Sequence, residues 1–429
     1  MGSTLIDIPE AEGVVVPCSK QKTNKFVDIC CRPMVSFLRE TKNNRHGLRK
    51  VIHSVKVGLA LVTVSLLFLL DPLYKGVGEN AMWAIMTVVL IFEFFAGATL
   101  SKGVNRGIGT TLGGGLGCLA AALAQAVGGV GKAMIVGITV FIFGAAATYT
   151  RQVPKLKRRF DYGAMIFILT FNLVVVSGLR AEQVFEIARD RLSAIAIGFA
   201  VCLFVSLLVF PIWAGDELHD SVVSRFELLA ISLQGFSKEY FGNVDENEKK
   251  TGFNFGSKCK SVLHTKTKDE TLVNFAKWEP CHGKFGIFYP WGKYLTIGED
   301  LRDLATIILS LKPCLKSTIQ PSENSTLGQS VKEPCEAIVA SQARMLSELG
   351  ESMKKMKKCE SEDKILLKLK SMRQELSLVA TPSTVGINHS DKTEGLGLAS
   401  FVYSMMEMIE KMEELAKQVE QLGQLGGFS

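Results

Sequence analysis

The stretch that decides the fold, FFAGATLSKGVNRGIGTTLGGGLG at residues 94–117, places a lysine and an arginine between two apolar segments. Its glycines recur at close to one helical turn, at Gly103, Gly107, Gly109, Gly113 and Gly117. A helix with almost no side chains along one face lets a neighbouring helix approach closely in lipid. The stretch therefore predicts closely packed membrane helices that carry fixed positive charge.

Long apolar runs are confined to one part of the 429-residue chain, between residues 51 and 213. A helix needs about 20 mostly apolar residues to cross a bilayer. Six runs are long enough, at residues 51–70, 81–100, 107–130, 133–150, 162–179 and 192–210. We therefore predict an all-α membrane protein with an N-terminal arm at 1–50, a transmembrane domain of six helices at 51–213 and a helical domain at 214–429.

Basic residues flank these runs unevenly, and the imbalance predicts the orientation of the chain. Twelve lie before the first span, between the second and third, and between the fourth and fifth, whereas five lie on the other side. The side richer in Lys and Arg stays in the cytosol, so we expect a cytosolic N-terminus. Six crossings return the chain to that side, which makes the domain at 214–429 cytosolic as well.

The cytosolic part has the composition of a helical domain. We expect helices at 218–240, 293–311, 334–358 and 364–378 and loops at 244–268 and 317–333. A further helix at 401–422 has apolar residues at alternating spacings of four and three, namely Phe401, Met405, Met408, Met412, Leu415, Val419 and Leu422. This spacing is typical of a coiled-coil seam. The seam can pack on its own domain or pair with a second subunit, and the sequence leaves both open.

Positive residues inside and beside the spans are the strongest functional signal. Lys102 and Arg106 lie one helical turn apart between the second and third spans, and Arg191 opens the sixth with Arg180 upstream. They can be interface anchors, but Arg191 lies on the side where basic residues are scarce, so we expect it to face protein or water. Arginine keeps its charge and binds a carboxylate through two parallel hydrogen bonds. These four residues predict a conduit for anions, carboxylates included.

Acidic residues in the same region have two interpretations each. Glu93, in the second span, is a counter-ion to a basic residue or a carboxylate that couples transport to protons. Glu182, Glu186 and Asp190 are spaced to share one helix face in an outer loop. They form an outer cation site or salt bridges with neighbouring arginines.

Several function classes lack their signals. The ten cysteines include no CxxC pair, so neither a zinc site nor a disulfide framework is indicated. No pairing of nucleophile and base, no metal-ligand set and no nucleotide-binding motif is present. We therefore expect no enzyme activity, no cofactor, no resident metal and no nucleic-acid partner.

Long motifs in a consistent order carry a resemblance to a known family. They are ENAMWAIMTVVLIFEFFAGATLSKGVNRGIGTTLGGGLG, KLKRRFDYGAMIFILTFNLVVVSG, RLSAIAIG, FPIWAGDELH and FAKWEPCHGKF. Together they resemble the aluminium-activated malate transporter family of plants. The resemblance implies an anion channel of the plasma membrane or vacuole that passes malate and inorganic anions. It also implies a homodimer with six spans per subunit and a conduit at the dimer axis.

The resemblance also implies roles for particular residues. The family's conduit arginines correspond to Arg106 in SKGVNRG and Arg191 in RDRLS. Glu182 and Glu186 match outer acidic positions that serve aluminium sensing in some members. The cytosolic family motif is Trp278, Glu279 and Pro280.

Three function classes follow from these observations. They are a passive anion channel, a proton-coupled organic-anion carrier that uses Glu93, and a membrane-anchored scaffold. Carriers commonly show internal repeats and broken spans, and neither is evident, so we favour the channel. Its expected partners are malate and other small anions, membrane lipid and a second copy of the chain. We expect a multi-pass protein in the plasma membrane rather than the vacuolar membrane.

Overall fold

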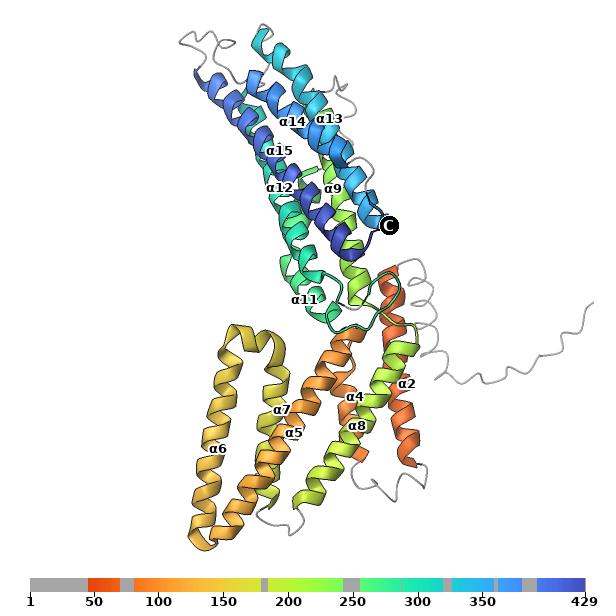
Figure 1. Cartoon of the computed structure of the whole chain (residues 1–429), viewed down its shortest axis with the longest axis vertical. Helices are drawn as coiled ribbons and strands as arrows, with labels where there is room; N and C mark the ends of the chain where they lie inside the picture. Colours follow the sequence, from red (N-terminus) through yellow and green to blue (C-terminus); the bar gives the residue numbers. More distant parts are fainter. Residues whose placement is uncertain are drawn as a thin grey trace, which may run out of the picture. The chain divides into compact units, whose positions relative to one another are not determined.

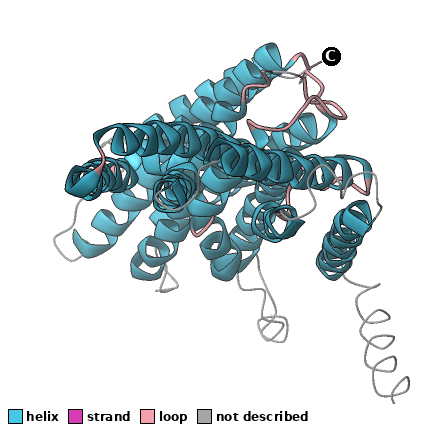
Figure 2. Ribbon diagram, turned by 90° about the horizontal axis from the view of Figure 1, so that it is seen from below, coloured by secondary structure: helices cyan, strands magenta, loops and turns pink. Residues whose placement is uncertain are grey.

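The computed structural model describes residues 45–69, 81–178, 184–241, 255–286, 288–318, 326–358, 362–379 and 392–428. These residues form helices and no strand; the one extended pairing among them is an isolated bridge between His282 and Phe285 (Figure 2). The chain divides into two compact units, residues 1–56 and 57–429. Helix α2 begins in the first unit, and the other described helices belong to the second. The all-α prediction is confirmed.

The N-terminal half is a set of apolar helices (Figure 1). In the part of the chain that the structure describes, five are long and apolar enough to cross a membrane: α2 (Arg45–Leu69), α5 (Ala96–Val127), α6 (Gly129–Gln152), α7 (Pro154–Gly178) and α8 (Val184–Leu208). A further helix, α4 (Ala81–Ile91), is apolar but shorter. The protein is therefore a multi-pass membrane protein.

The predicted span at 81–100 is not one helix, and this part of the prediction is wrong. Helix α4 ends at Ile91, residues 92–95 are not helical, and α5 begins at Ala96. The backbone N–H of Glu93 donates to Oγ1 of Thr99 at 3.0 Å, which closes the turn. Lys102 therefore lies inside α5 rather than in a connection between spans. Three phenylalanines among residues 92–95 make the break look like part of an apolar run.

Helix α5 packs closely on α7, as its glycines predicted. A Cβ atom added at Gly113 would lie 2.8 Å from the carbonyl oxygen of Phe167, and one at Gly109 would overlap the carbonyl of Gly163. No side chain larger than hydrogen fits at these positions without a shift of the backbone. Gly107, in contrast, has nothing within 4 Å, so it lies off the packed face.

The C-terminal half is also helical. Its helices are α9 (Ala214–Phe241), α10 (Phe255–Leu263), α11 (Lys266–Ala276), α12 (Trp291–Thr318), α13 (Thr326–Lys355), α14 (Glu362–Val379) and α15 (Lys392–Gly426). Helices α10 and α11 occupy much of the predicted loop at 244–268, and α13 begins inside the predicted loop at 317–333. Those two loop predictions are therefore partly wrong. The helices were missed because these segments are mostly polar and bury only a few apolar residues.

The heptad seam of α15 is buried within its own chain. All seven seam residues from Phe401 to Leu422 are at most 2% exposed and belong to the same core as residues of α12 and α14. Helix α15 lies along α12 (Figure 1). Of the two alternatives that the sequence left open, the structure shows packing on the helix's own domain.

Candidate anion site

Arg106 is buried inside the helical bundle. It lies on α5 and is 3% exposed. Its Nη1 donates to the hydroxyl of Tyr162 on α7 at 3.2 Å. Within the described part of the chain, its Nε has no hydrogen-bond partner. The guanidinium therefore retains a free donor in a region shielded from water.

Arg191 is also buried, on α8, and is 3% exposed. Its guanidinium carbon lies 3.7 Å from the centroid of the Trp83 ring on α4. Stacking of this kind stabilises a cation by about 0.5–2 kcal/mol. Neither Nε nor Nη1 of Arg191 has a hydrogen-bond partner among the described residues. A buried donor without a partner costs about 1–3 kcal/mol, so this site favours any ligand that accepts hydrogen bonds.

The two buried arginines act on each other electrostatically. Arg106 and Arg191 are near enough for their positive charges to repel. Two like charges are costly in a low-dielectric interior. An anion near these arginines would offset this repulsion and accept hydrogen bonds from their free donors.

Glu93 neutralises Lys102 rather than either arginine. Its carboxylate forms an ion pair with the ammonium of Lys102, and both side chains are partly exposed. Lys102 also lies 5.8 Å from the centroid of the Tyr162 ring, the same residue that binds Arg106. Lys102 therefore shares Tyr162 with Arg106 but already has a counter-ion.

The remaining predicted site residues are only partly described. Arg180, Glu182 and the side chain of Glu186 lie outside the described residues. Asp190 is described, and its Oδ1 accepts from Nε and Nη2 of Arg189 at 3.3 Å. Among the described residues, no three acidic, histidine or cysteine side chains are grouped to hold a metal ion.

The motif Trp278, Glu279 and Pro280 forms a junction between the two halves of the chain. The carboxylate of Glu279 accepts from the backbone N–H groups of Ala214 at 2.6 Å and Gly215 at 3.0 Å, where α9 begins. Burial raises the pKa of Glu279, and these donors oppose the rise. The ring of Trp278 lies 5.9 Å from the guanidinium of Arg159 on α7.

Sequence reasoning missed the aromatic partners of the arginines, Trp83 and Tyr162. Both occur inside the family motifs, in ENAMWAIM and RRFDYGAM. An aromatic residue in or beside an apolar span looks like a lipid-facing or interfacial side chain. Only the fold shows that these two contact buried cations.

The fold and site together define a class: a helical, multi-pass membrane protein whose bundle holds buried arginines with unused hydrogen-bond donors. A family model described as "Aluminium activated malate transporter" matches residues 42–392. The chain belongs to this family, which confirms the resemblance.

Relatives of known name support the assignment. The chain is 42% identical over 314 residues to aluminum-activated malate transporter 12 of Arabidopsis thaliana, covering 73% of this chain and 56% of the relative. It is 43% identical over 313 residues to aluminum-activated malate transporter 2 of the same plant, covering 72% of this chain and 60% of the relative. For transporter 1 of Triticum aestivum the identity is 36% over 327 residues, covering 73% and 70%. These relatives are named as transporters, not enzymes, and the match spans little more than half of the first one.

Proposed function

We propose that the protein is an anion channel that conducts malate and inorganic anions across a plant membrane. The observation that carries the proposal is the pair Arg106 and Arg191, buried side chains with free donors and mutual repulsion. Such a pair stabilises an anion and excludes a cation. The names of the relatives supply malate as the first substrate to test.

Conduction requires that an anion bind but also leave. The guanidinium groups replace part of the hydration shell of the anion, and their mutual repulsion is restored when it departs. Malate carries two carboxylates and gains more from paired guanidinium groups than chloride does. It is also harder to dehydrate, so both anions are substrates to measure.

A second copy of the chain completes the conduit in this proposal. Two buried arginines per chain are few for a pore, but a two-fold axis presents each of them twice. We propose six spans per subunit, with α4 and α5 forming two of them, and cytosolic termini at the plasma membrane. Arg180 joins the arginines that line the conduit in this arrangement.

The pairing of Glu93 argues against a proton-coupled carrier. Glu93 forms an ion pair with Lys102, so a counter-ion role accounts for this carboxylate without coupling to protons. In whole-cell recordings with a malate or chloride gradient, we expect currents that reverse near the anion equilibrium potential. Glu93→Gln should keep that reversal potential. Electrically silent uptake tied to proton flux, abolished by Glu93→Gln, would instead establish the carrier.

A further inference from the structure

A cavity that includes neither Arg106 nor Arg191 lies along α5, beside Asn105, Ile108 and Leu112. It has a volume of about 330 Å³ and lies between α5, α6 and α7. Asn105, Leu112 and Phe143 are among its lining residues. The lining runs from Asn105 to Leu112 along α5, which is about 10 Å of helix.

The two ends of this cavity differ in polarity. Asn105 of α5 and Thr150 of α6 lie at one end. Leu112 and Phe143 lie at the other, because α5 and α6 run in opposite directions through it. On its open side Ile108, Leu112 and Phe160 are exposed. The cavity is therefore apolar along its length and polar at one mouth, as an acyl chain with its ester group is.

Basic side chains adjoin the polar mouth. The guanidinium of Arg159 lies 5.3 Å from the centroid of the Phe160 ring, which lines the cavity. The backbone carbonyl of Arg159 accepts from Nδ2 of Asn105 at 3.0 Å. Arg159 thus contacts two residues that line the cavity, Phe160 and Asn105.

The structure describes no acidic partner for the basic residues at the start of α7. Lys155, Lys157 and Arg159 are exposed in the first turns of α7, and no acid among the described residues pairs with them. Arg151, in contrast, is neutralised by Asp161 at 2.8 Å. Cations at a helix N-terminus are unfavourable beside the positive end of the helix dipole. An anion at this place would relieve both effects.

We propose that this cavity is a binding site for an anionic phospholipid of the inner leaflet. One acyl chain fills the apolar slot between α5, α6 and α7. The phosphorylated headgroup contacts Lys155, Lys157 and Arg159. The inner leaflet is the source of such lipids, and the basic end of α7 faces it in the proposed topology.

The test uses the full-length chain in detergent, titrated with dioleoyl phosphatidylinositol 4-phosphate and followed by native mass spectrometry. Dioleoyl phosphatidylcholine is the neutral comparison. We expect the anionic lipid to bind about tenfold more tightly. The triple variant Lys155→Gln, Lys157→Gln and Arg159→Gln should lose that preference.

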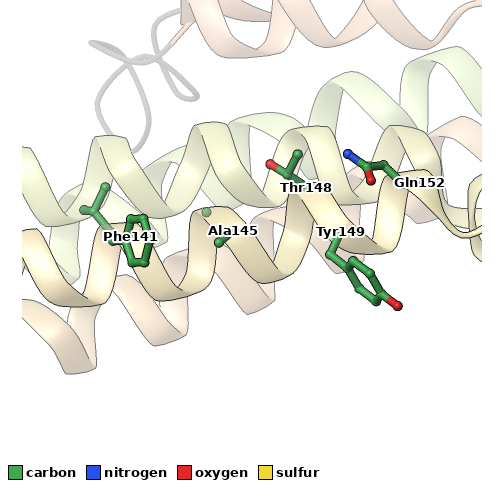
Figure 3. Close-up of a pocket in the computed structure, with 7 residues that line it drawn as sticks. Phe141, Ala145, Thr148, Tyr149 and Gln152 are labelled. Carbon is green, nitrogen blue, oxygen red and sulfur yellow. The ribbon is translucent and has the colours of Figure 1, made fainter.

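Two neighbouring alanines of α6 provide a variant that fills the cavity and a control that does not. Ala146 lines the cavity, so Ala146→Phe should fill it and weaken lipid binding by about tenfold. Ala145 lines instead a hollow along α6 itself, with Phe141, Tyr149 and Gln152 (Figure 3). Ala145→Phe is therefore the matched control and should bind lipid like the wild type. The control for the loss of three positive charges is the triple variant Lys354→Gln, Lys357→Gln and Lys358→Gln, which should keep the preference for the anionic lipid.

Three results would overturn the proposal. Ala146→Phe that binds the lipid as tightly as the wild type would place the acyl chain elsewhere. Full displacement of the lipid by free inositol 1,4-bisphosphate would show a headgroup-only surface. Ala146→Phe that converts an assembled protein into single subunits would make the cavity a subunit interface.

Discussion

At the scale of single residues, Asp300 shows how burial of a charged carboxyl group destabilises the folded protein. It lies on α12, is 4% exposed, and its Oδ2 has no hydrogen-bond partner within the described part of the chain. Burial, and after it the charge of Glu414, raises the pKa of Asp300 to about 6, whereas Lys411 opposes the rise. Asp303 and Glu299 add further repulsion.

The raised pKa fixes the sign of a pH dependence. The folded protein holds the Asp300 proton more tightly than the unfolded chain, whose pKa is near 3.8. Stability therefore falls as the pH rises from 3.8 to about 6 and stays low above that. Asp300→Asn should remove this fall and raise stability at pH 7 by about 1–3 kcal/mol.

Denaturation of the full chain at pH 5 and pH 7, followed by tryptophan fluorescence, measures the effect. The matched control is Asp303→Asn, because the Asp303 carboxylate is partly exposed and pairs with Lys411. Removal of its charge weakens the repulsion on Asp300 but also breaks the ion pair with Lys411, so this control should gain less stability at pH 7 than Asp300→Asn. Loss of stability in Asp300→Asn would mean that the charged form is the favoured one.

Asp269 is also buried, but its carboxylate has basic partners that compensate for the burial of its charge. Both of its oxygens accept from Arg225, and Arg302 donates to Oδ2 at 3.2 Å. Asp269→Asn would leave the buried guanidinium of Arg225 and the partly buried one of Arg302 without this charge partner, and we expect a loss of about 3–5 kcal/mol. Glu351→Gln removes an exposed ion pair with Lys355 and should change stability much less, because water already solvates both charges. Equal losses in the two variants, measured by denaturation at pH 7, would contradict a special role for burial.

At this scale the sequence predicts the charged residues of the site but not their aromatic partners. Arg106 and Arg191 are conspicuous because they interrupt or adjoin apolar runs. Their partners Trp83 and Tyr162 are not, because aromatic residues are common in membrane spans. The free donors of Arg191 depend on three-dimensional packing, which no local pattern encodes.

At the scale of elements, close packing of α5 on α7 is the feature most open to test. Gly113→Ala would press a methyl group against the carbonyl of Phe167, and overpacking of this kind costs about 1–3 kcal/mol. Gly114→Ala is the matched control, since nothing lies within 4 Å of that position. It should keep or raise stability, because alanine favours helix by about 1 kcal/mol over glycine.

Thermal unfolding of the two variants in detergent gives the comparison. We expect the melting temperature of Gly113→Ala to fall and that of Gly114→Ala to stay or rise. If both variants melt alike, the glycine face does not set the approach of the two helices.

Element boundaries were less predictable than element types. The glycine spacing indicated a packed helix face because the requirement is local and repeated. The break at 92–95 depends on Thr99 accepting from the backbone of Glu93 and on Ala96 donating to the carbonyl of Ile212. The second contact joins residues far apart in sequence, so no window around the break contains it.

At the scale of the whole molecule, the burial of the α15 seam concerns assembly. Its apolar residues are used within the chain, so in the proposed dimer we assign subunit contact to other surfaces. Met408 is fully buried, and Met408→Ala should lower stability by about 2–5 kcal/mol without changing the number of subunits. Tyr403→Ala, at an exposed position of the same helix, should do neither. A Met408→Ala protein that becomes monomeric, as measured by native mass spectrometry, would show that α15 holds subunits together.

The central claim is that Arg106 and Arg191 stabilise a permeating anion, and Arg191 allows its most direct test. Two positions away on the same helix, Arg189 is mostly exposed and pairs with Asp190. Removing each arginine in turn changes the same charge on the same helix, but of the two only Arg191 has buried donors without a partner among the described residues.

The measurement is whole-cell current carried by malate or chloride at matched surface expression. We expect Arg191→Ala to reduce both currents by about tenfold or more, because the buried positive charge is lost. Arg191→Lys should retain part of the current, since lysine keeps the charge but not the planar fork. Arg189→Ala should stay within about twofold of the wild type. Currents that persist unchanged in Arg191→Ala, or fall equally in Arg189→Ala, would contradict conduction past the buried arginines.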